Sequence, residues 1–149
     1  MSNDTSANSV GSFSPAAFEE IEHTADRAIR IYGSDLQELL LNAAGAMNSL
    51  LDSEHDGRTR LVKKSVALEV IDAESLLVEW LNELAFWAET ESLVFHKFVL
   101  HSVSPTHLKA TIYGRRTVQL EKHIKAVTYH NLKIIKTDEG LTATIVFDV

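Results

Sequence analysis

The sequence predicts an α+β fold, built as a two-layer domain in which two long helices pack on one face of a β-sheet. Three observations predict it: two segments with helical apolar periodicity, several stretches with strand-like alternation, and two turn sequences between neighbouring strand candidates. The length of 149 residues fits one domain with a sizeable core. Residues 1–17 have no apolar period, so we expect a disordered N-terminal extension before a domain at residues 18–149.

Two helices are predicted, over residues 35–51 and 73–90. Apolar residues of the first recur on one helical face: Leu36, Leu39, Leu40, Ala43, Ala44, Met47, Leu50 and Leu51. Ser34 is expected to cap this helix, with Gln37 completing a capping box. The stripe of the second helix consists of Leu77, Trp80, Leu81, Leu84 and Trp87. Asp72 is expected to cap it.

Most of the remaining chain is predicted to form strands. The candidates are residues 18–23, 28–32, 62–71, 93–103, 107–114, 126–136 and 141–149. Residues 104–106 and 137–140 have the composition of hairpin turns. In the last strand apolar and polar residues alternate, which indicates that one face of the sheet packs on the helices.

Composition excludes several classes of protein. The chain has 14 Lys and Arg against 21 Asp and Glu, a formal charge of −7, so it lacks the overall basic footprint of a nucleic-acid-binding protein. It has no cysteine, which excludes disulfides and thiolate zinc sites and suits the cytoplasm. No apolar run approaches the roughly 18–20 residues of a transmembrane helix, so we expect no membrane association.

Charge is nevertheless uneven along the sequence. Residues 107–136 contain seven Lys or Arg and one acidic residue, Glu121. Two interpretations remain open. A bipolar surface would orient a protein partner through complementary fields, whereas two ordinary solvated faces would have no such role.

Two short polar segments are candidates for a metal or catalytic site. The motif HTAD at residues 23–26 offers an imidazole, a hydroxyl and a carboxylate, although its local sequence also suits an ordinary turn. Asp148 is next to the main-chain carboxylate of Val149, and two such groups repel each other unless a cation lies between them. A hard divalent ion takes oxygen ligands of this kind. The alternative for Asp148 is a solvated strand end.

A third candidate is the segment that contains Lys125, Tyr129 and His130. Its basic, aromatic and imidazole groups are suited to binding a phosphate or the acidic surface of a partner. The alternative is a half-buried strand whose Tyr and His side chains are satisfied within the fold.

Four segments together resemble the archease family: FEEIEHTADRAIRIY (18–32), LLVEWLNELAFWAETE (76–91), IKAVTYHNL (124–132) and VFDV (146–149). The resemblance implies helices packed on a β-sheet and a chaperone-like accessory protein without catalytic residues of its own. Such a protein activates a tRNA-splicing RNA ligase of the RtcB type by promoting its guanylylation and multiple turnover. Modulation of a tRNA cytosine methyltransferase is associated with some members.

The resemblance also implies a divalent metal site. Carried over by residue, its ligands are Asp26, Asp148 and the main-chain carboxylate of Val149, with calcium the ion expected in a structure and magnesium or manganese as alternatives. His23, Lys125, Tyr129 and His130 match recognisable family positions, and we expect them to contact the partner or to support the metal ligands. No strong direct binding of nucleic acid is expected.

The sequence departs from the family pattern in two places. Arg27-Ala28 replaces an apolar residue and a glycine after HTAD, and the segment at residues 114–124 lacks an acidic loop. Two further functions stay open: a metal-dependent hydrolase in which Asp26 and Asp148 activate water, and a binding module for tRNA or a methyltransferase.

Overall fold

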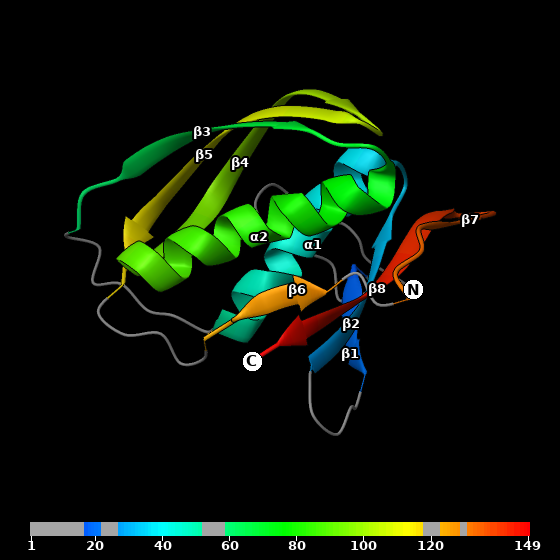
Figure 1. The fold of residues 1–149 in the computed structure, drawn as a ribbon, viewed down its shortest axis with the longest axis horizontal. Helices are drawn as coiled ribbons and strands as arrows, with labels where there is room; N and C mark the ends of the chain where they lie inside the picture. Colours follow the sequence, from blue (N-terminus) through cyan, green and yellow to red (C-terminus); the bar gives the residue numbers. More distant parts are fainter. Residues whose placement is uncertain (1–16, 22–26, 52–58, 118–122, 129–130) are drawn as a thin grey trace, which may run out of the picture.

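The computed structural model describes residues 17–21, 27–51, 59–117, 123–128 and 131–149, and this part of the chain contains two helices and eight strands (Figure 1). The helices are α1 (Leu36–Leu51) and α2 (Ala73–Glu91). The strands are β1 (Phe18–Ile21), β2 (Arg27–Gly33), β3 (Val62–Glu69), β4 (Leu93–Ser104), β5 (His107–Arg116), β6 (Ala126–Thr128), β7 (Ile135–Thr137) and β8 (Gly140–Asp148). The predicted α+β class and both predicted helices are confirmed.

The described strands form two antiparallel sheets, whereas the sequence led us to expect one. The larger sheet has the order β1-β2-β8-β6, with β7 also paired to β8, and the smaller sheet has the order β3-β5-β4. In Figure 1 the helices lie between the two sheets, and α1 contacts both β2 and β4. Alternation along a strand reveals which of its faces is apolar, but not which strands share a sheet. The alternation of apolar and polar residues therefore could not predict that the strands form a second sheet.

Strand β8 has two different neighbours along one of its edges. Its other edge pairs with β2 from Arg27–Phe147 to Gly33–Leu141, while β6 and β7 pair with opposite ends of β8. The single strand predicted at residues 126–136 is therefore wrong. Asn131 adopts a left-handed φ of 57°, and the Ile134 N–H donates to Glu74 Oε2 of α2 at 3.0 Å. Residues 131–134 therefore continue neither short strand along β8.

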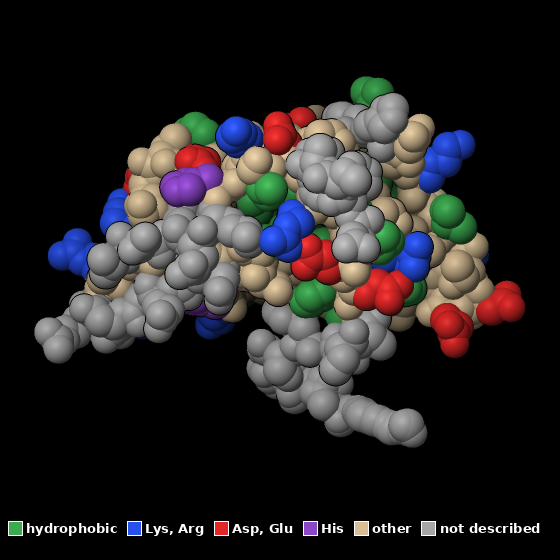
Figure 2. Space-filling model, turned by 90° about the horizontal axis from the view of Figure 1, so that it is seen from below, with side chains coloured by type: hydrophobic (Ala, Val, Ile, Leu, Met, Phe, Trp, Pro, Cys, Tyr) green, Lys and Arg blue, Asp and Glu red, His purple; other side chains and the backbone are tan. Residues whose placement is uncertain are grey.

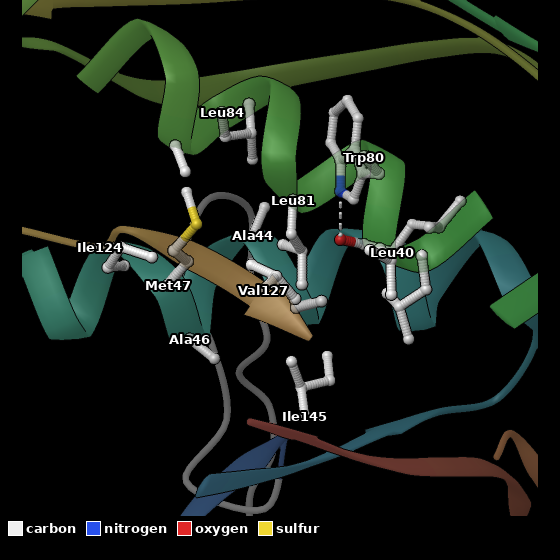
Figure 3. Close-up of a cluster of buried hydrophobic side chains, with 14 of the residues drawn as sticks. Leu40, Ala44, Ala46, Met47, Trp80, Leu81, Leu84, Ile124, Val127 and Ile145 are labelled. Carbon is white, nitrogen blue, oxygen red and sulfur yellow. Dashed lines mark hydrogen bonds between the residues drawn. The ribbon is translucent and has the colours of Figure 1, made fainter. Parts of the chain in front are cut away.

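The core lies between the helices and extends to both sheets. Trp80 of α2 is fully buried, and its Nε1–H donates to the Leu40 carbonyl of α1 at 2.9 Å (Figure 3). Its ring meets Phe98 of β4 edge to face, with centroids 5.7 Å apart. Ile145 of β8 and Val127 of β6 belong to the same apolar cluster on the side of the larger sheet. One tryptophan thus links the two helices to the smaller sheet.

Both helices begin with a side-chain cap. At α1 the cap is Asp35 and not the predicted Ser34, because Asp35 Oδ1 accepts the Glu38 N–H at 2.8 Å. Glu38 in turn accepts the Ser34 N–H at 2.6 Å, so the return hydrogen bond comes from Glu38 and not from the predicted Gln37, and it reaches the residue before the cap. At α2 the predicted cap is confirmed, with Asp72 Oδ1 accepting the Ser75 N–H at 2.7 Å.

The Asp72 cap is expected to make a pH-dependent contribution to stability. Hydrogen bonds from the Ser75 side chain and backbone lower the pKa of the Asp72 carboxyl below its usual 3.8. Because the folded-state pKa is the lower one, this stabilisation is complete above pH 3.8 and is lost as the pH falls through the folded-state value. Asp72→Ala should lower the Tm by about 2–4 °C at pH 7, with a smaller difference near pH 3.

Thermal melts of the variants at both pH values check this prediction. The matched control is Asp72→Asn, which keeps a side-chain acceptor without a titrating carboxyl. It should melt within about 1 °C of the wild type at pH 7. An equal loss for Asp72→Ala at both pH values would contradict the role of the ionised cap.

Candidate functional site

Three segments of the chain meet at one end of the larger sheet. Arg27, the first residue of β2, pairs in register with Phe147, and Ala126 of β6 pairs with Asp148. The Lys125 N–H donates to the main-chain oxygen of Asp148 at 2.7 Å. The start of β2, the end of β8 and the start of β6 are therefore adjacent, and Figure 1 shows the C-terminal residue at this end. We call this end of the sheet the β8 corner.

The side chains of β8 alternate at this corner. Phe147 is fully buried in the core, while Asp148 points to the opposite face and is exposed. Val149 is half-buried and packs against the core. The Asp148 carboxylate makes no ion pair with any residue in the described ranges. A rigid strand thus holds an exposed carboxylate that has no described counter-ion.

The arginines of β2 are paired with glutamates of β1 and not with Asp148. Arg27 forms an ion pair with Glu20, and Arg30 Nη1 lies 2.7 Å from Glu19 Oε1. Interactions with Tyr32 and Glu19 raise the pKa of the Arg30 guanidinium above its usual value. Arg27, which stands where the family pattern has an apolar residue, therefore does not neutralise the Asp148 carboxylate at the β8 corner.

Four of the predicted site residues lie outside the described residues: His23, Asp26, Tyr129 and His130. Of the others, Asp148 and Val149 lie together at the β8 corner, with the Lys125 backbone beside them. Arg27, which follows Asp26 in the chain, pairs with the residue that precedes Asp148. The predicted ligand set of Asp26, Asp148 and Val149 itself stays a prediction.

The donor chemistry at the β8 corner suits a hard divalent cation, because such ions take carboxylate and carbonyl oxygens. Among the described residues alone, no group of three or more His, Asp or Glu side chains is close enough to hold a metal ion. The described part of the corner therefore supplies an incomplete ligand set.

The described basic residues of the run at 107–136 do not all lie on one surface. Arg116 pairs with Glu91 of α2, whereas Lys109 lies on β5 and Lys136 on β7. In the view of Figure 2, Lys and Arg side chains lie next to Asp and Glu side chains. Sequence analysis missed Lys63 and Lys97, which the smaller sheet brings onto the same face as Lys109. Alternation along β3, β4 and β5 shows which residues of each strand share a face. Only the strand register shows that these residues are neighbours.

The fold defines a class of small α+β proteins in which two helices lie between two antiparallel sheets. The model of the "Archease protein family (MTH1598/TM1083)" matches residues 18–149. This chain belongs to the archease family, as the sequence resemblance predicted. No helix among its described residues is long and apolar enough to cross a membrane.

Relatives with known names or structures cover most of the chain. "Protein archease" of Methanosarcina mazei is 37% identical over 142 residues, 89% of this chain and 95% of that protein. The solution structure of protein 1598 of Methanobacterium thermoautotrophicum is 31% identical with a TM-score of 0.63, covering 89% of this chain and 99% of that one. The crystal structure of a Thermotoga maritima protein described as "an archease, possible chaperone" is 25% identical with a TM-score of 0.65, covering 88% and 96%.

Proposed function

We propose that this protein is an accessory protein, without catalytic turnover of its own, that activates an RtcB-type tRNA-splicing RNA ligase. It does so by promoting guanylylation of the ligase and its multiple turnover. Membership of the archease family supports the proposal, as does the description of the Thermotoga maritima relative as a possible chaperone. The observation that carries it is the β8 corner, where exposed Asp148 has no described counter-ion beside the strand that follows Asp26.

A divalent ion at this corner would be held by Asp26, Asp148 and the main-chain carboxylate of Val149. When bound, the ion would supply positive charge for a phosphate of the ligase reaction. The chain's own residues provide the rigid frame: Phe147 is buried in the core, and β2 and β6 pair with β8 on both sides of the corner. Such a frame holds carboxylates in place before a partner arrives.

Lys125 is the described member of the proposed partner-contacting group. Its side chain is exposed, and its N–H is hydrogen-bonded to the Asp148 carbonyl, so the lysine emerges beside the corner. An ammonium group at this place suits the phosphates of a guanylylated partner. His23, Tyr129 and His130 complete the group in the proposal.

A guanylylation assay tests the activator function directly. Purified ligase is incubated with labelled GTP and a divalent metal, with and without substoichiometric amounts of this protein, and ligase-bound GMP is measured over time. We expect faster labelling and more than one activated ligase molecule per molecule of this protein. If an active ligase shows no change, the activator proposal fails and the methyltransferase modulator becomes the leading alternative. Phosphodiester hydrolysis by this protein alone would support the hydrolase instead.

A further inference from the structure

The smaller sheet has one face on the helices and one face turned away from them. Val66, Ala110 and Ile112 point inward and are buried. The neighbouring residues in each strand therefore point outward, and they include Lys63 of β3 and Lys109 of β5. In Figure 1 no described helix or strand lies on this outer side.

Three lysines and one tyrosine form what we call the basic face: Lys63, Lys97, Lys109 and Tyr113. Tyr113 is the central member, because it pairs in register with Lys63 on one side and Lys97 on the other. The Lys97 ammonium lies 5.1 Å from the centroid of the Tyr113 ring. Lys109 lies on the same face of β5, about 13 Å from Tyr113 at roughly 3.3–3.4 Å per residue.

The charges of the basic face are available for a partner. Lys63, Lys97 and Lys109 are exposed, and none makes an ion pair within the described residues. Glu69 is the one acidic residue among the outward-facing positions of these three described strands, and it lies at the far end, 3.6 Å from His107. This concentration of positive charge contrasts with the formal charge of −7 for the whole chain.

Hydroxyl and imidazole groups lie between the lysines. Thr111 is two residues from Tyr113 on the same face, and its hydroxyl lies 2.7 Å from His101 Nε2. Ser102, in register with Lys109, lies 2.8 Å from His107 Nε2. The face therefore combines ammonium groups for phosphates, an aromatic ring for stacking and small polar groups for sugar hydroxyls.

We infer that the basic face binds single-stranded RNA. Lysines on three adjacent strands match a flexible polyanion that crosses the sheet, and a half-exposed tyrosine between two of them offers a base a stacking surface. An acidic polypeptide would use the charges, but its aspartate and glutamate side chains have no aromatic ring to stack on Tyr113. A single strand is favoured over a duplex, because a duplex hides the faces of its bases. RNA is favoured over DNA, because the hydroxyl groups of Thr111 and Ser102 suit hydrogen bonds with the 2′-OH.

Three phosphate contacts set the expected strength. Each contact with a single strand contributes about −0.7 to the slope of log affinity against log salt, so three give about −2.1. The affinity should then fall about 20-fold between 50 and 200 mM salt. This is modest, salt-sensitive binding, in keeping with an acidic protein that carries one local basic face. The inference is independent of the β8 corner and of the ligase proposal.

Fluorescence anisotropy with a labelled 12-nucleotide oligouridine tests the inference. Lys63→Gln/Lys97→Gln removes two of the three contacts, so the salt slope should fall to about −0.7. The matched control is Lys133→Gln/Lys136→Gln, which changes the net charge equally at exposed positions outside the basic face. The control should keep the wild-type slope. Tyr113→Leu should weaken oligouridine binding about fivefold or more while leaving the affinity for inorganic polyphosphate unchanged.

Several results would overturn the inference. If both double-lysine variants lost the same affinity for oligouridine, the binding would depend on the net charge of the protein and not on the basic face. Equal affinity for oligothymidine or for polyglutamate would show that RNA is not the preferred partner. If correctly folded wild-type protein did not bind oligouridine at 50 mM salt, the inference would be wrong. Circular dichroism establishes that each variant is folded.

Discussion

Replacement of Trp80 by alanine is expected to lower the free energy of unfolding by about 3–5 kcal/mol. Trp80 has no solvent exposure, donates a hydrogen bond to the Leu40 carbonyl and packs edge to face on Phe98. The substitution therefore opens a cavity where α1, α2 and the smaller sheet meet. Urea denaturation followed by circular dichroism measures the loss as a lower midpoint with an unchanged slope.

Trp80→Phe is the matched variant for this site. It keeps an aromatic ring against Phe98 but lacks the N–H that binds the Leu40 carbonyl, so we expect a smaller loss of about 1–2 kcal/mol. Similar losses for both variants would assign the stabilisation to the hydrogen bond. A loss below about 1 kcal/mol for the alanine variant would contradict the central place of Trp80 in the core.

The proposed metal site predicts that calcium stabilises the folded protein and that Asp148→Asn removes most of this stabilisation. If calcium is present at about 100 times its dissociation constant, binding to the folded state contributes about 2.7 kcal/mol. The substitution removes one anionic ligand of the proposed set without changing the shape of the side chain. Unfolding in urea with calcium chloride and with a chelator measures the difference, and the guanylylation assay should show a parallel loss of ligase activation.

Asp138→Asn is the control for Asp148→Asn. Asp138 is exposed in the turn between β7 and β8, so the control changes the net charge equally at the opposite end of β8. It should keep the full calcium effect. Retention of the calcium effect by Asp148→Asn would exclude this carboxylate from the metal site, while the ligase proposal would still be decided by the guanylylation assay.

The helices were the most predictable part of the fold because their signals are local. The apolar stripe through Trp80 and the cap at Asp72 both lie within one segment of chain. The error at α1 had an equally local origin. Ser34 and Asp35 are both good caps, and the choice depends on Glu38, which accepts the Ser34 N–H. A pattern of residue types does not rank two adjacent caps.

The strands were less predictable because pairing decides where they end. Residues 126–136 have a strand-like composition throughout, yet among the described residues of this segment only 126–128 and 135–136 pair with β8. The interruption depends on Asn131 and on a hydrogen bond between Ile134 and Glu74, which are distant in sequence. No window of the sequence contains both partners.

The candidate sites show the same limit. The resemblance predicted that Asp26 and Asp148 act together, whereas the spacing between them carried no such information. The structure adds the pairing of Arg27 with Phe147, which places the start of β2 beside the end of β8. Counting charges along the chain also missed the basic face, because Lys63 and Lys97 meet only through the register of both with Tyr113.

The central position of β8 has a consequence for the order of folding. Its partner β2 lies near the other end of the described chain, and the Thr142 hydroxyl donates to the Ile31 carbonyl across a separation of 111 residues. Contacts between such distant residues require closure of a long loop and slow the folding reaction. The β8 corner cannot form until the chain from Arg27 to Asp148 has been made, so a shorter chain could not present it to a partner.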